Sequence, residues 1–240
     1  NLGVALQKLD KTEEAIKNYN KAISLKKDFA EVLSNLGNAM YQLGNKNEAL
    51  EYFEKALKAK PDYAEPYFNK GVIHYESYGN NKEALNNFEK AIKIKPDYAE
   101  AYNSIGLVYQ QILQFDKSIL SYKKAIELKT NYEKPYNNLG NLLNELGNYK
   151  EASKYYFKAI EIKSDYASAY SNLLFNLNYE LNFDLNLYLS VAKKFRHNCS
   201  TKKKLSFKYQ YVKEPKKLRI GFVSADFGNH PGGYFTLSTL

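Results

Sequence analysis

The sequence of 240 residues contains a single cysteine and no long apolar run. Cys199 cannot form a disulfide within the chain, which excludes a disulfide-stapled fold and favours a reducing compartment. No stretch approaches the ~20 consecutive apolar residues of a transmembrane helix, and no signal-like apolar segment opens the chain. The sequence therefore predicts a cytoplasmic protein without a membrane partner. The hydrophobic fraction of 44% excludes collagen or a purely disordered tail.

Acidic charge is scarce only near the end of the chain. The net charge is +9, which could indicate binding to nucleic acid. Residues 1–192, however, contain 24 basic and 24 acidic side chains, whereas residues 193–240 contain 11 basic and two acidic ones. Because the whole surplus lies in the last fifth of the chain, no basic stripe follows the first 192 residues. We therefore predict no nucleic-acid partner, and a change of architecture near residue 193.

An internal repeat accounts for the neutral part. Glycines recur with spacings of 34, 34, 35 and 34 residues, each followed after 12 or 13 residues by Ala or Ser, then by an aromatic residue and an alanine; they are Gly3, Gly37, Gly71, Gly106 and Gly140. This pattern resembles the tetratricopeptide repeat, TPR, whose period is 34. The resemblance covers residues 1–167 and implies a superhelical solenoid of about five helical pairs with a peptide-binding groove.

The second repeat gives the same answer from its hydrophobic pattern. Leu33, Leu36 and Met40 recur at helical spacing, and Gly44-Asn45 then marks a loop. A second amphipathic stripe follows and stops before Pro61, which cannot continue a helix. The one extra residue after Gly71 is predicted to lie in the loop between paired helices.

An asparagine stands two residues before the glycine in most repeats. A side-chain amide offers a donor and an acceptor together, which matches both groups of a peptide backbone. We therefore predict that these residues bind protein or peptide substrates in the groove, although abundant asparagine could also stand on a polar helix face by chance. The basic slots of TPR domains that clamp a terminal carboxylate are filled here by Ser34, Glu100, and Ser104 or Asn137, which disfavours that ligand. The predicted peptide-binding residues are Asn1, Asn35, Asn69, Asn138 and Asn172, with Ser104 as the departure.

The repeat is lost after residue 167. Residues 168–199 are predicted to be a sixth partial repeat ending in a capping helix over 185–199, with Leu185, Leu189, Ala192 and Phe195 on its apolar face. Residues 200–217 are predicted to be a basic linker.

In 218–240 a short apolar run, LRIGFVS, predicts a buried parallel strand followed by a loop. The predicted fold class is thus mostly α, a TPR solenoid followed by the first strand and loop of a truncated Rossmann-like α/β lobe.

The segment LRIGFVSADFGNHPGGYF, following a TPR array, resembles the O-linked N-acetylglucosamine transferase family, including its SPINDLY branch. The resemblance implies a protein O-glycosyltransferase of GT-B type that transfers N-acetylglucosamine from UDP-GlcNAc to Ser or Thr without a metal. It also implies that His230 is catalytic, as a base or a substrate-orienting residue.

Two alternatives stay open at this stage. One is a SPINDLY-type fucosyltransferase that uses GDP-fucose, and the other is a TPR scaffold that binds peptides without catalysis. The chain looks cut at both ends, so we expect this piece to be inactive alone, its nucleotide-sugar site lying in the missing part of the catalytic domain.

Overall fold

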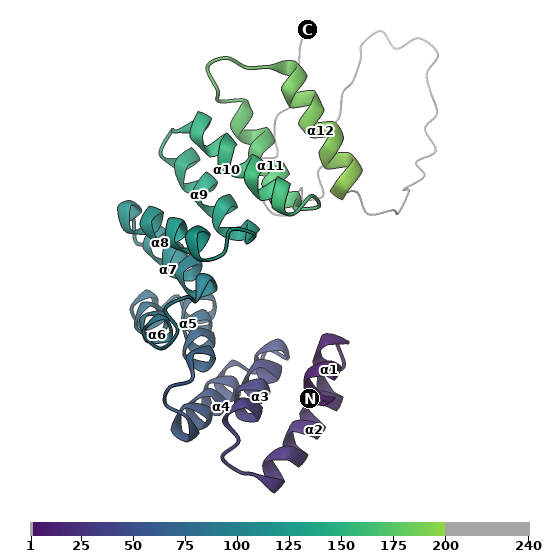
Figure 1. Cartoon of the computed structure of the whole chain (residues 1–240), viewed down its shortest axis with the longest axis vertical. Helices are drawn as coiled ribbons and strands as arrows, with labels where there is room; N and C mark the ends of the chain where they lie inside the picture. Colours follow the sequence, from purple (N-terminus) through teal and green to yellow (C-terminus); the bar gives the residue numbers. More distant parts are fainter. Residues whose placement is uncertain (1, 200–240) are drawn as a thin grey trace, which may run out of the picture. The chain divides into compact units, whose positions relative to one another are not determined.

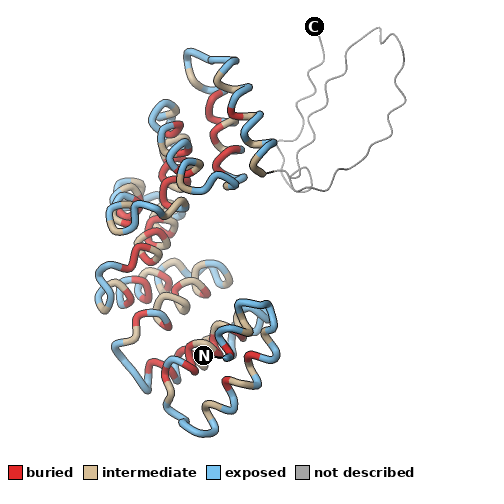
Figure 2. Tube along the Cα trace, turned by 45° about the vertical axis from the view of Figure 1, so that its right-hand side comes forward, coloured by how far each residue is buried: buried red, intermediate tan, exposed pale blue. Residues whose placement is uncertain are grey.

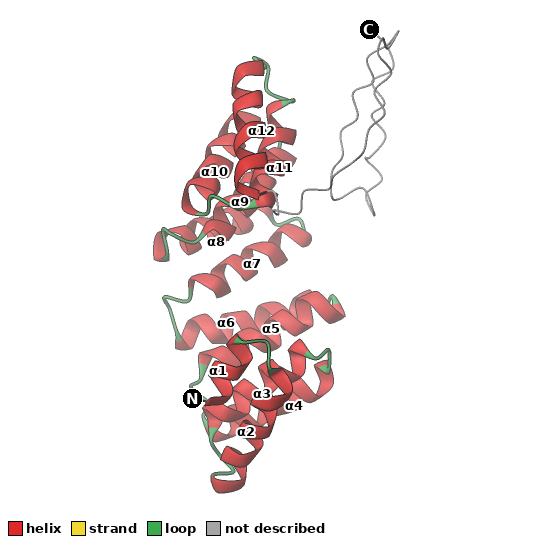
Figure 3. Cartoon of the chain, turned by 90° about the vertical axis from the view of Figure 1, so that its right-hand side faces the viewer, coloured by secondary structure: helices red, strands yellow, loops and turns green. Residues whose placement is uncertain are grey.

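The computed structural model describes residues 2–199, which form twelve α-helices and no strand (Figure 1). Figure 3 shows only helices joined by short loops in this part of the chain. The predicted strand at 218–224, His230 and Asn1 lie outside the described residues. The helices are α1 (Leu2–Lys8), α2 (Thr12–Leu25), α3 (Ala30–Gln42), α4 (Lys46–Ala59), α5 (Ala64–Tyr78), α6 (Asn81–Ile94), α7 (Ala99–Gln111), α8 (Phe115–Leu128), α9 (Glu133–Glu145), α10 (Tyr149–Ile162), α11 (Ala167–Leu177) and α12 (Leu185–Cys199).

The helices pack as successive antiparallel pairs, from α1 with α2 to α9 with α10, and each pair packs on the next one along the chain. We call the odd-numbered member of a pair its first helix and the even-numbered member its second helix. Buried residues lie mainly where helices of a pair or of neighbouring pairs meet (Figure 2). This arrangement confirms the solenoid of helical pairs predicted from the 34-residue spacing.

Each pair is held by a glycine of the first helix against an aromatic ring of the second. A Cβ atom at Gly106 would lie 2.5 Å from Cε1 of Tyr122, and one at Gly37 would lie 2.5 Å from Cε1 of Phe53. Equivalent contacts occur at the other repeat glycines, and the rings of Phe53 and Tyr122 are fully buried. The glycine therefore recurs because the ring of the second helix occupies the space that a side chain would need.

The turns inside the repeats use a left-handed backbone. Gly44 and Gly147, seven residues after the repeat glycine, have φ of 83° and 78°. In the fourth repeat the same place is taken by Leu113, with φ of 60° and a side chain that is 69% exposed. Since the left-handed region crowds Cβ against the backbone, Leu113 is strained where glycine is not.

The extra residue of the third repeat lies elsewhere than the sequence predicted. Helix α5 is 15 residues long, whereas α3, α7 and α9 are 13 residues long, and only Gly79 and Asn80 separate α5 from α6. Gly79 adopts φ of 60° and the N–H of Asn80 donates to the carbonyl of His74. The insertion therefore lengthens the first helix, because a left-handed glycine cap stops it later.

Helix α12 has the predicted bounds and packs on α11, but its apolar face differs from the prediction. Val191 is buried, and Leu187, Tyr188 and Phe195 pack against the same cluster. Leu185 and Leu189 are 57% and 44% exposed. The prediction was therefore right for Phe195 and wrong for Leu185 and Leu189, because leucines also stand on a more exposed side of this helix.

Substitution of Gly106 by Ala is expected to destabilise the protein by about 1–2 kcal/mol. Overpacking against Tyr122 costs about 1–3 kcal/mol, and the better helix propensity of Ala returns up to about 1 kcal/mol. Combined with Tyr122→Leu, the effect should be smaller than the sum of the single changes, as measured by urea unfolding. Strict additivity of the two substitutions would contradict the contact.

Substitution of Leu113 by Gly is expected to stabilise the protein by about 0.5–1 kcal/mol, because it relieves a left-handed backbone at an exposed position. Gly147→Ala, at the equivalent turn, is the matched control and should destabilise. Thermal and urea unfolding measure both, and a destabilising Leu113→Gly would show that the turn is not strained.

Candidate functional site

The first helices of neighbouring repeats approach one another. Contacts join α3 to α5, α5 to α7, α7 to α9 and α9 to α11, whereas successive second helices of residues 2–199 make no comparable contact. The first helices therefore converge on one side of the array. We call the side of α3, α5, α7, α9 and α11 that points away from the second helices the first-helix face.

The predicted asparagines occupy this face. A residue two positions before the repeat glycine lies about 200° around the helix from it, and hence opposite the aromatic ring of the second helix. All five described members are half-buried. We call this set the amide ladder; it consists of Asn35, Asn69, Asn138 and Asn172, with Ser104 in α7.

Hydrogen bonds tie three ladder amides to the preceding repeat. Nδ2 of Asn69 donates to Oδ1 of Asn38 at 2.7 Å. Nδ2 of Asn138 donates to Oδ1 of Asn103 at 3.0 Å. Nδ2 of Asn172 donates to two acceptors, Oδ1 of Asn137 at 3.0 Å and Oδ1 of Asn141 at 2.9 Å. Asn35 makes no hydrogen bond of this kind with residues 2–199.

The acceptors of these bonds were missed by the sequence prediction. Asn103 and Asn137 are buried, with exposed fractions of 4% and 5%, and stand directly before the ladder position. Asn38 and Asn141 directly follow the repeat glycine. The sequence did contain a signal for these acceptors, namely two adjacent asparagines as in NNLG. The first of them, Asn137, accepts a hydrogen bond from the next repeat, and the second, Asn138, is the ladder residue.

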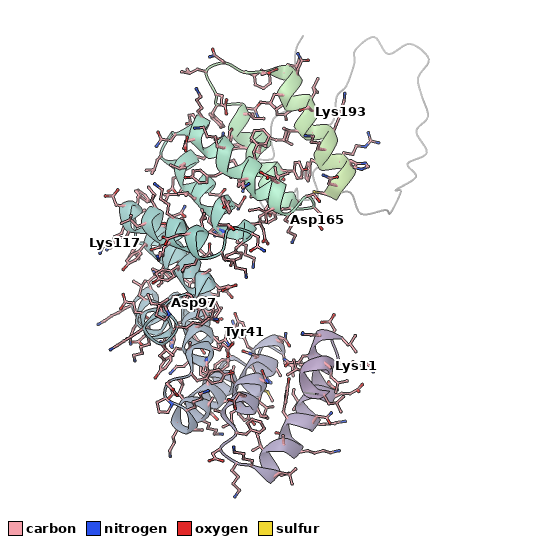
Figure 4. The ribbon with its side chains drawn as sticks, viewed as in Figure 1. Lys11, Tyr41, Asp97, Lys117, Asp165 and Lys193 are labelled. Atoms are coloured by element: carbon pink, nitrogen blue, oxygen red, sulfur yellow. The ribbon has the colours of Figure 1, made fainter. Side chains whose placement is uncertain are left out.

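A second row of hydrogen bonds runs near the other end of the first helices. Nε2 of Gln7 donates to Gln42 at 3.1 Å, and Nε2 of Gln110 donates to Oε2 of Glu145 at 3.0 Å. The hydroxyl of Tyr41, labelled in Figure 4, donates to Oε2 of Glu76 at 2.7 Å. The two residues of each pair are 35 positions apart in the sequence, one more than the 34-residue period. Each bond therefore joins a residue to the one that follows its equivalent on the next first helix.

Burial, helped by the Glu76 carboxylate, raises the pKa of Tyr41 to about 12. The hydroxyl therefore stays protonated at neutral pH and keeps donating to Glu76. At Glu100 burial is the largest single influence and acts to raise the pKa. The hydrogen bond from Lys129 at 2.7 Å, a backbone hydrogen bond and the charges of Lys129 and Lys95 together outweigh it, so the pKa is lowered. Glu100 thus stays ionised and paired.

Asn172 uses both of its amide hydrogens in bonds between repeats, and Asn69 and Asn138 use one each, but the oxygens of all three stay open. No described residue donates to Oδ1 of Asn69, Asn138 or Asn172. Within residues 2–199 the one buried side-chain polar atom without a partner is Oδ1 of Asn81, so these ladder oxygens are not sealed in the interior. The first-helix face therefore presents fixed carbonyl oxygens as hydrogen-bond acceptors.

Other kinds of site find no support in the part of the chain that the structure describes. No three His, Cys, Asp or Glu side chains gather there as possible metal ligands. None of its helices combines the length and apolar character of a membrane span. Two surface hollows lie at the turns inside the second and fourth repeats, away from the amide ladder; they are lined by residues 44–48 with Tyr78 and by residues 113–117 with Leu146.

Sequence models of the tetratricopeptide repeat match most of the described chain. The matches are to TPR repeat at 3–44 and 77–112, and to Tetratricopeptide repeat at 30–63, 99–132 and 134–166. Together they span more than half of the chain, which therefore belongs to the tetratricopeptide repeat family. Among curated protein sequences none matches the chain.

Solved structures of other TPR proteins are similar to this chain. MamA is 28% identical, with a TM-score of 0.57 over 68% of this chain and 95% of MamA. PilF of Pseudomonas aeruginosa is 20% identical, with a TM-score of 0.72 over 82% of this chain and 88% of PilF. YrrB is 23% identical, with a TM-score of 0.56 over 75% of this chain and 91% of YrrB. The last two likenesses show the fold alone.

Assignment to the O-linked N-acetylglucosamine transferase family was wrong. Only TPR models match, none of them beyond residue 166, and no glycosyltransferase domain matches the chain. The assignment depended on one short strand-and-loop segment, and such a segment is common to many α/β proteins. The nucleotide-sugar donor inferred with it has no support. The catalytic role of His230 and the transferase activity stay untested predictions, since His230 lies outside the described residues.

The bonds between repeats predict unequal effects of ladder substitutions on stability. Asn138→Ala removes the bond to buried Asn103 and should lower the free energy of unfolding by about 0.5–1.5 kcal/mol. Asn35→Ala, at the same position of a repeat without this bond, is the matched control and should change it by less than about 0.5 kcal/mol. Equal effects in urea unfolding would contradict the inter-repeat bond.

Proposed function

We propose that this protein is a scaffold that binds an extended segment of another protein along the first-helix face. The observation that carries the proposal is the amide ladder, in which side chains at one position of successive first helices keep their oxygens open. These oxygens can accept hydrogen bonds from backbone N–H groups, which every non-proline residue of a bound segment supplies. Binding of this kind depends on the partner's backbone more than on its side chains.

The bonds between repeats support the proposal energetically. A free asparagine side chain loses rotamer freedom when a ligand fixes it, and that loss weakens binding. Asn69, Asn138 and Asn172 are already fixed by neighbours at 2.7–3.0 Å. Their oxygens are therefore preorganised before a partner arrives.

The spacing of the rungs defines the length of the bound segment. Packed helices lie about 8–10 Å apart, and an extended chain advances about 3.3 Å per residue. Neighbouring rungs thus contact positions about three residues apart, and the five rungs from Asn35 to Asn172 span about 13 residues. The structure of YrrB is described as that of a TPR protein with an unusual peptide-binding site, so the fold is compatible with such a ligand.

A library of random 15-residue peptides displayed on phage tests the proposal. Enriched peptides should bind the purified chain in fluorescence anisotropy, and Asn69→Ala/Asn138→Ala/Asn172→Ala should weaken binding at least about tenfold, since each lost bond contributes about 0.5–1.5 kcal/mol. Asn20→Ala/Asn86→Ala, which alters exposed asparagines of second helices, is the control and should leave binding unchanged.

N-methylation of the enriched peptide tests the same contacts without changing the protein. Methyl groups on every third backbone nitrogen remove the donors of one register, and one of the three possible registers should abolish binding. Unchanged affinity of the triple variant and of all three methylated peptides would contradict the proposal, as would the absence of any enriched peptide.

A further inference from the structure

The acidic charge of the helices is unevenly distributed. The helices α3, α5, α7, α9 and α11 carry six glutamates and two lysines, whereas α2, α4, α6, α8 and α10 carry 11 acidic and 14 basic residues. One of the two lysines, Lys70, is directed towards α4, where it pairs with Glu54. The acidic surplus therefore belongs to the first helices.

Two of these glutamates stand two helical turns after a ladder amide on the first-helix face. Glu76 follows Asn69 by seven residues, and Glu145 follows Asn138 by seven. Seven residues are almost exactly two helical turns, so each carboxylate lies on the same side of its helix as its amide. The position about one turn before the ladder residue lies on this side too: it is Lys134 before Asn138, the opposing charge, and a glutamate in the earlier repeats, namely Glu31, Glu65 and Glu100.

Glu76 and Glu145 are held by neutral donors. Glu76 accepts from the Tyr41 hydroxyl, and Glu145 accepts from the Gln110 amide. Neither forms a salt bridge with a residue of the described chain, in contrast to Glu31 and Glu100, which pair with Lys60 and Lys129 at 3.7 and 2.7 Å. Both carboxylates are exposed, so each is fixed in place with its charge not neutralised.

The face therefore offers acceptors of two kinds, the ladder oxygens and two fixed carboxylates. Both kinds favour a partner rich in donors, and a carboxylate forms its strongest contacts with a cation. Glu76 and Glu145 stand two repeats apart, about 16–20 Å by the usual helix spacing, which an extended chain covers in about five or six residues.

We propose that the first-helix face selects extended polypeptide segments with two Lys or Arg side chains about five or six residues apart, which pair with Glu76 and Glu145. The inference rests on the proposed function, because the ladder amides hold the backbone of the same segment. A partner segment of opposite charge is repelled by these carboxylates, which gives the face a preference that backbone contacts alone do not provide.

The test uses three labelled 15-residue peptides of Gly, Ser, Ala and Thr, which carry two lysines, two glutamates or no charge at positions six apart. Anisotropy should show the lysine peptide binding about tenfold more tightly than the glutamate peptide in 50 mM NaCl, with a smaller difference in 300 mM NaCl. Moving the lysines to two residues apart should remove most of the gain.

Glu76→Gln/Glu145→Gln should lower the affinity for the lysine peptide about three- to tenfold and leave the uncharged peptide unaffected. Glu13→Gln/Glu51→Gln, at exposed positions of second helices, is the matched control and should change neither. An unchanged affinity of the Glu76/Glu145 variant, or equal binding of the glutamate peptide, would overturn this inference. In that case the proposed function still stands if the uncharged peptide binds the unaltered protein and fails to bind the Asn69→Ala/Asn138→Ala/Asn172→Ala variant. If no peptide binds, both proposals fall.

Discussion

The contact between a glycine and an aromatic ring is the constraint on which the rest of this structure depends. It sets the distance between the two helices of a repeat and fixes the rotation of the first helix about its axis. Once Gly140 faces Tyr156, Asn138 must face the other way, because two residues correspond to about 200° of helix. The position of the first-helix face is therefore decided by packing on the opposite side of the same helix.

Repetition of this contact produces the amide ladder. Since every pair has the same internal geometry, equivalent residues of successive first helices come close enough to hydrogen-bond, as Asn103 and Asn138 do at 3.0 Å. Each such bond leaves one oxygen of the donor side chain open. One set of asparagines thus contributes to cohesion between repeats through its Nδ2 atoms and, in the proposed function, to a surface for a partner through its Oδ1 atoms.

Much of the fold could be predicted from the sequence, because its signals are periodic. The spacing of Gly37, Gly71 and Gly106 predicted the helical pairs, and the bounds of α12 were also correct. The apolar face of α12 was correct only at Phe195, since Leu185 and Leu189 compete with Val191 in the same pattern and only packing on α11 distinguishes them. The extra residue after Gly71 was misplaced because a glycine can end a helix as readily as it can form a loop.

The candidate site was predictable in position but not in bonding. The positions of the ladder asparagines could be predicted from their 34-residue spacing in the sequence. Which acceptors their Nδ2 atoms bind could not, because these acceptors lie 31 or 35 residues away, such as Asn38 and Asn137. Family assignment failed for a related reason. The family assignment depended on a short apolar run and one histidine that occur only once in the sequence. No second copy of the pattern was therefore present against which the assignment could be checked.

A structure of the protein with a bound 15-residue peptide tests the central claim most directly. The account predicts that backbone N–H groups of the peptide donate to Oδ1 of Asn69, Asn138 and Asn172, while the Nδ2 atoms keep their bonds to the preceding repeat. A peptide bound away from the first-helix face, or ladder amides that break their inter-repeat bonds to donate to the peptide, would contradict it.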